Sequence, residues 1–172
     1  LNNFEKKKIE SSDIVLKVDN LWTSGEKELS KIRGISFDVK EGEIVGIAGI
    51  DGNGQSELIE AICGLRKVEK GDVYLDNINI TNKSPLKVRE SGLSHIPEDR
   101  NLRGLNRGLN IAENVIALKF NKKPYSNNTI INNNEVIDIA NRLINKFDIR
   151  PSNALVSTTN LSGGNAQKVV VA

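Results

Sequence analysis

A glycine-rich stretch at residues 49–57 has the residue types needed to bind phosphate. It follows an apolar run at 44–48 and precedes an apolar stripe of helical spacing, so a strand, a loop and a helix follow one another directly. Such a loop wraps its backbone N–H groups around an anion and directs the positive end of the following helix at it. We therefore predict that this glycine loop binds phosphate through Gly49, Asp51, Gly52, Asn53, Gly54, Gln55, Ser56 and Glu57.

The end of the glycine loop departs from a complete phosphate-binding motif. The complete motif follows its last glycine with a lysine, which neutralises the β- and γ-phosphates, and a hydroxyl, which binds Mg²⁺. Here Gln55 replaces the lysine, Ser56 keeps the hydroxyl as the candidate Mg²⁺ ligand, and Glu57 adds a negative charge. A neutral amide supplies no charge, so we expect Gln55 alone to lower nucleotide affinity by about tenfold or more. The alternative is a glycine-rich turn that binds nothing.

A second stretch, Leu161 to Gln167, also has the chemistry of an anion site. Ser162 and two glycines open a predicted helix at 165–172, so Ser162 and the glycine backbone form an exposed helix N-terminus that attracts anions. The glycines permit close approach of a phosphate. In isolation the pattern fits a capped helix start equally well. The candidate contacts are Ser162, Gly163, Gly164 and Gln167.

Composition narrows the class of protein. The 172 residues suit one domain, and 38% hydrophobic with 27% charged residues describe a globular protein of mixed class. A net charge of +2 gives no electrostatic case for nucleic acid, which we do not expect as a partner. No apolar run is long enough to span a bilayer, and the single cysteine, Cys63, agrees with a reducing compartment. The chain lacks methionine and begins at Leu1, so we expect a piece of a longer protein.

Periodicity places most of the chain in strands and helices. Alternating residues predict strands around 14–18, 35–39 and 71–76, with a hairpin turn at Asp76 and Asn77. Continuous apolar residues predict strands at 44–48 and 93–96. Helical spacing and caps predict helices at 56–65, 85–89, 111–118 and 135–147, with a capping box from Asn110 to Glu113. Residues 121–134 should be an exposed loop.

Read in order, these motifs resemble one family. The glycine loop, then Ser94 to Arg100, then Leu161 to Gln167 together resemble the ATP-binding domain of ABC transporters. More narrowly, the chain is similar to the C-terminal ATPase domain of tandem import ATPases for sugars and nucleosides, of the ribose, galactoside and basic-membrane-protein type, truncated after the signature motif. The resemblance runs from about Ile14 to the last residue. It implies an α/β P-loop NTPase fold, here partial, with an antiparallel β layer, an incomplete RecA-like core and a helical subdomain.

The resemblance implies a division of the chain and a set of partners. Residues 1–12 become a linker or tail, 13–98 the antiparallel β layer with the phosphate-loop part of the core, 99–160 the helical subdomain, and 161–172 the signature motif and the start of its helix. The expected partners are the first ATPase domain of the same full-length chain and membrane permease subunits. The expected cofactors are ATP and Mg²⁺, weak or absent at its own site, and the expected location is cytoplasmic, at the inner face of the cell membrane.

Two positions and the end of the sequence depart from the family pattern or fit it in part. Glu98 stands where the family usually has a glutamine that senses Mg²⁺, and we count it among the nucleotide contacts. Trp22 is the candidate for stacking on adenine, with ordinary packing as the favoured alternative. The sequence stops before the family's Mg²⁺-binding aspartate, catalytic glutamate and switch histidine, so no catalytic residue is assigned. We expect the fragment alone to be inactive, and marginal, oligomeric or completed by another chain.

The sequence favours a function in import and leaves alternatives open. In the leading hypothesis the chain couples ATP binding and hydrolysis to uptake of a sugar or nucleoside. Its own phosphate loop is degenerate, and its signature motif contacts nucleotide that the partner domain holds. The alternatives are a scaffold or regulatory domain that binds no nucleotide, and an ABC ATPase without a transport role. The transported compound cannot be read from these residues.

Overall fold

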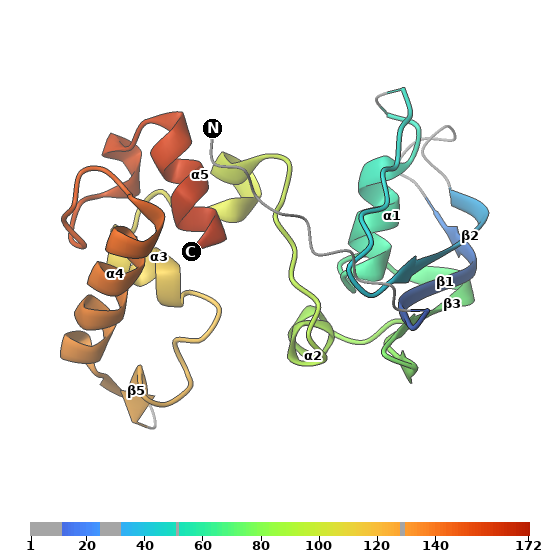
Figure 1. Cartoon of the computed structure of the whole chain (residues 1–172), viewed down its shortest axis with the longest axis horizontal. Coiled ribbons are helices and arrows are strands. Elements are labelled where there is room, and N and C mark those ends of the chain that lie inside the picture. Colours follow the sequence, from blue (N-terminus) through green and yellow to red (C-terminus); the bar gives the residue numbers. More distant parts are fainter. Residues whose placement is uncertain (1–11, 25–31, 51, 128–129) are drawn as a thin grey trace. The chain divides into compact units, whose positions relative to one another are not determined.

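A computed structural model describes residues 12–24, 32–50, 52–127 and 130–172 (Figure 1). The predicted linker at 1–12 lies outside the described residues except for Ser12. The chain forms two compact units, residues 1–95 and 96–172, and each is described by itself. The first unit contains β1 (Ile14–Thr23), β2 (Ile32–Lys40), α1 (Gln55–Ile62), β3 (Val68–Leu75), β4 (Ile78–Asn79) and α2 (Pro85–Glu90).

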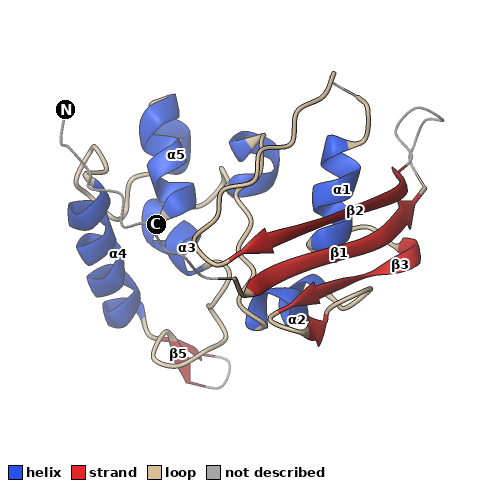
Figure 2. Ribbon diagram, turned by 45° about the vertical axis from the view of Figure 1, so that its right-hand side comes forward, coloured by secondary structure: helices blue, strands red, loops and turns tan. Residues whose placement is uncertain are grey.

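The first unit is built on an antiparallel sheet with strand order β2, β1, β3, β4 (Figure 2). Its core joins one face of the sheet to the two helices, through Val18 and Val73 from the strands, Leu58 and Ile62 from α1, and Val88 from α2. The predicted alternation of apolar and polar residues is therefore confirmed for β1, β2 and β3. Sheet and helices together are an α/β arrangement.

An irregularity in β1 keeps its apolar residues on the core face. Val18 and Leu21 are both buried although they are three residues apart, because the register shifts between them and Asn20 has φ +47°. Opposite the shift lies Gly71, with φ +84°, and a Cβ there would collide with the backbone oxygens of Asp19 and Asn20. Only glycine fits this position.

Local signals fix the ends of several elements. Asp76 and Asn77 both have positive φ, at 46° and 64°, and join β3 to β4 as the predicted hairpin turn.

Cys63 follows α1 and is 8% exposed. The burial of Cys63 raises the pKa of its thiol, as expected for a residue that packs as a small hydrophobe.

The strand predicted at 44–48 is wrong. These residues have no strand structure, and the side chains of Ile44 and Ile47 are 87% and 48% exposed. A strand needs a neighbour to accept its backbone hydrogen bonds, and no described segment pairs with residues 44–48. The strand predicted at 93–96 is absent for the same reason, and His95 is an exposed loop residue.

The second unit is mainly helical. It contains the π-helical turn η2 (Arg100–Gly104), α3 (Ile111–Ile116), the small hairpin β5 (Ser126–Asn127) and β6 (Ile130–Ile131), α4 (Asn133–Phe147), the short 3-10 helix η3 (Thr158–Asn160) and α5 (Gly163–Val171). Ile111, Ala140, Ile144 and Val169 from α3, α4 and α5 form its core. The predicted loop at 121–134 thus contains a hairpin and ends in the first residues of α4.

Two helix starts in this unit follow the predicted pattern. The amide of Glu113 donates to the side chain of Asn110 at 2.9 Å, and the amide of Asn110 donates to the Glu113 carboxylate at 2.9 Å, which confirms the capping box. α5 begins at Gly163, two residues before the predicted start, with Ser162 as its N-cap. Both helices therefore start directly after the capping residue predicted for them, which is Asn110 for α3 and Ser162 for α5.

Candidate nucleotide-binding residues

The glycine loop is shaped by two residues of positive φ. Gly52 has φ +83°, and apart from its two chain neighbours no described residue has an atom within 4 Å of the place a Cβ would occupy. Gly54 has φ +102° as the N-cap of α1. Such conformations favour glycine and leave the loop backbone free of side chains. The amide of Asn53 donates to the carbonyl of Ile50 at 3.2 Å, which closes the turn. The predicted contact Asp51 lies outside the described residues.

The first turn of α1 presents donors to the loop. Gly54 offers no side-chain cap, so the N–H groups of Gln55, Ser56 and Glu57 begin the helix without an intrahelical acceptor. The hydroxyl of Ser56 is exposed and can reach a ligand or ion. Glu57 is half-buried and its negative charge lies in the same turn. The turn thus combines a positive helix end with one competing carboxylate.

The side chain of Gln55 turns back onto the loop. Its Nε2 donates to the carbonyl oxygen of Ile50 at 3.2 Å. A Cβ on Gly49 would collide with the same amide, so Gln55 occupies the space that the absence of a side chain at Gly49 leaves. Gln55 therefore supplies a neutral donor that is already used within the protein, where a complete phosphate loop has a lysine for the ligand.

Ser162 organises the N-terminus of α5. Its hydroxyl accepts from the backbone amide of Asn165 at 3.4 Å and from the side-chain amide of Asn165 at 3.0 Å. Gly163 and Gly164 are exposed, and no atom lies within 4 Å of a Cβ built on Gly164. Gln167 is half-buried on the same helix. The four predicted contacts of this segment therefore lie on and beside one helical turn whose outer side is open.

A network behind this turn holds α5 against the end of α4. The backbone amide of Arg150 donates to the side chain of Asn165 at 2.8 Å, and Nζ of Lys168 donates to the carbonyl oxygen of Asp148. Asp148 has φ +49° at the end of α4 and its carboxylate accepts from Arg150 Nε at 2.9 Å. The hydrogen bond and charge of Arg150, with the charge of Lys168, hold the pKa of the Asp148 carboxyl below its usual range.

The segment Pro97 to Arg100 leads into η2. Glu98 is exposed, and the side chain of Asp99 accepts from the amides of Asn101 and Leu102 at 2.8 and 3.1 Å. Arg100 Nε is buried and has no hydrogen-bond partner among the described residues. Arg100 and Asn165 were not predicted to have separate roles. The signal in the sequence that could have indicated them is their place inside the motifs Ser94 to Arg100 and Leu161 to Gln167.

Trp22 is engaged within the sheet. Its Nε1 donates to the side chain of Asn20 at 3.0 Å, and Nζ of Lys70 lies 5.6 Å from the ring centroid. The ring is half-buried, and a Cβ on Gly34 would lie 3.4 Å from its Cζ2 atom. These contacts favour ordinary packing for Trp22 over stacking on a ligand.

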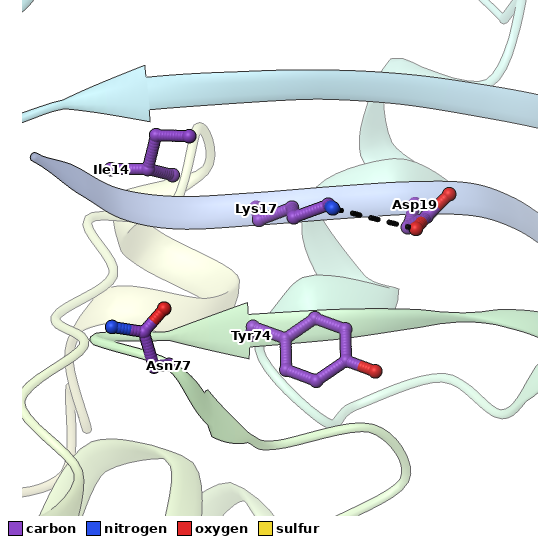
Figure 3. Close-up of a pocket in the computed structure, with 5 residues that line it drawn as sticks. All are labelled: Ile14, Lys17, Asp19, Tyr74 and Asn77. Atoms are coloured by element: carbon purple, nitrogen blue, oxygen red, sulfur yellow. Dashed lines mark ion pairs between the residues drawn. The ribbon is translucent and has the colours of Figure 1, made fainter.

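A surface pocket lies on the β1 and β3 strands of the first unit (Figure 3). It is lined by Ile14, Lys17, Asp19, Tyr74 and Asn77, and the Lys17 ammonium lies 3.7 Å from the Asp19 carboxylate. The charged pair satisfies itself on an exposed surface, where such pairs contribute little. None of the predicted site residues lines this pocket.

The sequence is similar to those of known ATP-binding proteins. The family model described as "ABC transporter" matches residues 32–172. The nucleoside import ATP-binding protein NupA of Lactococcus lactis subsp. cremoris is 42% identical over 98% of this chain, and the guanosine import ATP-binding protein NupO of Bacillus subtilis is 41% identical over 97%. The chain spans only 33% of either relative.

A solved structure shares the fold. The ATP-binding cassette MJ1267, in its ADP conformation, aligns with a TM-score of 0.67 at 23% identity, over 93% of this chain and 63% of that one. This likeness supports the P-loop NTPase fold expected from the sequence. In the described part of the chain, no helix is long and apolar enough to cross a membrane.

Proposed function

Because the chain belongs to the ABC transporter family of ATP-binding domains, we propose that it is one half of an asymmetric import ATPase. In this proposal, ATP is held by the first ATPase domain of the same full-length subunit, and Ser162, Gly163, Gly164 and Gln167 contact its phosphates from the opposite side. The observation that carries the proposal is the open first turn of α5, where Ser162 is fixed by Asn165 and no atom approaches the Cβ position of Gly164. Backbone N–H groups at a helix start favour bound phosphate.

The glycine loop contributes a weaker site of its own. Its backbone fits a phosphate, because Gly52 and Gly54 add no side chains to the loop and the first amides of α1 have no acceptor within the helix. Mg²⁺ would be held by the hydroxyl of Ser56 and would neutralise phosphate charge. Gln55 adds no charge and its amide already donates to Ile50. We therefore propose that the loop binds nucleotide weakly and does not support turnover by itself.

The likeness to nucleoside and guanosine import proteins supports the transport role. We propose that hydrolysis in the paired domains drives closure and reopening, which moves permease subunits in the membrane. The transported compound is a nucleoside or a simple sugar, since relatives named for both share the match over nearly the whole chain. The subunit would be cytoplasmic and peripheral, at the inner face of the cell membrane, through contact with the permease.

The decisive experiment introduces a long, positively charged side chain into the signature segment, which is Leu161 to Gln167. Ser162→Arg, made in the full-length subunit with its permease in proteoliposomes, should abolish both ATP turnover and uptake, because the arginine fills the open side of the α5 turn. Asn141→Arg introduces the same side chain at an exposed position of α4 in the same unit, and as the matched control it should leave both rates unchanged. Unchanged turnover and uptake in Ser162→Arg would rule out the proposed role.

A second candidate function follows from the position of Gln55. If its bond to Ile50 persists in solution, the loop is only a structural turn and the domain is a scaffold that binds no nucleotide. Calorimetry with Mg-ATP separates the two, using a full-length subunit whose first domain has lost its loop lysine. Residual binding that disappears when Gly52 is replaced by valine supports the weak site, and no binding supports the scaffold.

A further inference from the structure

The guanidinium of Arg100 lies directly against the first residue of α5. A Cβ built on Gly163 would be 2.7 Å from Nη2 of Arg100 and 3.6 Å from its Cζ. Gly163 has no positive φ, so alanine here would not strain the backbone, but it would push the Arg100 guanidinium away from its present position. The glycine at this position therefore makes room for one particular side chain.

The backbone that carries Arg100 is fixed along α5. Asp99 caps the η2 turn, and the amide of Leu105 donates to the carbonyl of Arg100 at 2.9 Å. At the other end of η2, a Cβ on Gly104 would lie 3.0 Å from Cγ2 of Val170. The η2 turn thus packs against α5 near both of its ends, and these contacts place the Arg100 side chain at the start of α5.

The electrostatics of this contact are unfavourable unless an anion is present. A helix N-terminus carries a partial positive charge, and a guanidinium beside it adds a like charge. Arg100 Nε is also buried without a hydrogen-bond partner among the described residues, which costs free energy. A purely structural contact would be served better by an apolar side chain of similar volume. The cost is offset when negative charge binds at the turn.

We propose that Arg100 is a positioning residue for the signature segment, which holds Gly163 and the open turn of α5 in place and adds positive charge behind the amides that receive the partner's phosphate. The inference rests on the proposed function of that segment. Arg100 acts through Gly163 and through the local potential, and it is assigned no contact with nucleotide. The substrate class that it serves is a nucleoside triphosphate held by another domain.

The test uses the full-length subunit with its permease and measures kcat and KM for ATP separately. Arg100→Gln should lower kcat by about tenfold or more with KM within about twofold, because ground-state ATP binding belongs to the other domain. Arg100→Lys keeps the charge and should recover much of the rate. Arg107→Gln removes an exposed arginine from the same loop and should leave both constants unchanged.

A double-mutant cycle tests whether Gly163 and Arg100 act as one unit. Gly163→Ala should lower kcat both by displacing the guanidinium and by crowding the phosphate, so the same change should cost clearly less in the Arg100→Gln background than in the native chain. Additive losses would overturn the proposal. If a melting curve shows that Arg100→Gln does not fold, the other two variants carry the test. The proposal then requires a lowered kcat in Gly163→Ala and a kcat close to the native value in Arg100→Lys.

Failure of this inference is distinguishable from failure of the proposed function. If Ser162→Arg abolishes turnover while Arg100→Gln has wild-type kcat, the signature role stands and the role of Arg100 is wrong. If Arg100→Gln and Arg100→Lys have the same low kcat, the positive charge of Arg100 does not contribute to turnover, and that part of the proposal is wrong. If Ser162→Arg is itself neutral, the proposed function fails, and the inference fails with it.

Discussion

The amide of Gln55 donates to the carbonyl oxygen of Ile50 across the glycine loop, at 3.2 Å. A lysine at this position carries a charge to the phosphates in a complete motif, whereas Gln55 is neutral and is held by the loop itself. The same bond fills the space beside Gly49. The proposed weakness of this site would thus have two causes, which are the missing charge and a donor that must first leave an intramolecular partner.

Gln55→Lys should therefore raise Mg-ATP affinity at this loop by about tenfold or more, because a charge-assisted hydrogen bond replaces a neutral one. Calorimetry measures the dissociation constant in the full-length subunit from which the lysine of the first domain's loop has been removed. Gln55→Ala is the matched control and should bind no better than the native chain. Equal affinities for the lysine and alanine variants would show that the loop is not a phosphate site.

Gly71→Ala should destabilise the first unit by about 2 kcal/mol or more, since the new Cβ collides with backbone oxygens of Asp19 and Asn20 and φ is +84°. Gly92→Ala is the control, because Gly92 also has positive φ, at +108°, but no atom lies within 4 Å of its Cβ position. It should cost only the backbone strain, about 1 kcal/mol. Urea denaturation of the chain measures both, and equal losses would contradict the collision at Gly71.

Elements fixed by neighbouring residues could be predicted from the sequence. The capping box of Asn110 and Glu113 and the turn at Asp76 and Asn77 need only residues within four positions of one another, and both are present. The helix at 135–147 was found because its apolar stripe is long and regular. Local chemistry was sufficient in each case.

Features that depend on distant residues could not be predicted. The apolar run at 44–48 has the composition of a buried strand, but a strand also needs a neighbour, and composition does not reveal one. The β1 shift opposite Gly71 depends on a chain segment some fifty residues away. In the candidate sites, residue types indicated phosphate chemistry. The bond of Gln55 to Ile50 and the contact of Arg100 with Gly163 required tertiary structure.

Asp148→Asn should lower the melting temperature at neutral pH more than in acid. The pKa of the Asp148 carboxyl is lowered in the folded chain by Arg150 and Lys168. The carboxylate therefore stabilises the fold at pH values above the ordinary carboxyl pKa, and this stabilisation is lost as the pH falls through the pKa of the folded chain. Asparagine tolerates the φ of +49° and keeps the carbonyl that accepts from Lys168, so the change isolates the charge. The side chain is exposed, and we expect a shift of a few degrees at most.

Melting curves from pH 7 down to pH 2.5 measure this difference for the native chain and the variant. Asp138→Asn, which removes an exposed carboxylate from α4, is matched in charge and should show no comparable convergence in acid. If the native and Asp148→Asn curves differ equally at every pH, the ion pairs with Arg150 and Lys168 do not stabilise the fold.

Ile44→Ser and Ile47→Ser should have small effects on the stability of this chain and large effects on its solution behaviour. Their side chains are 87% and 48% exposed, so little packing is lost, and the free energy of unfolding should change by no more than about 0.5 kcal/mol for Ile44→Ser. Leu58→Ala, at 2% exposure, is the contrasting control and should cost about 2 kcal/mol or more. Exposed apolar residues close together favour association, so the double serine variant should sediment as a smaller species and bind less hydrophobic dye than the native chain. A loss of stability in Ile44→Ser as large as in Leu58→Ala would mean that residues 44–48 are packed in solution.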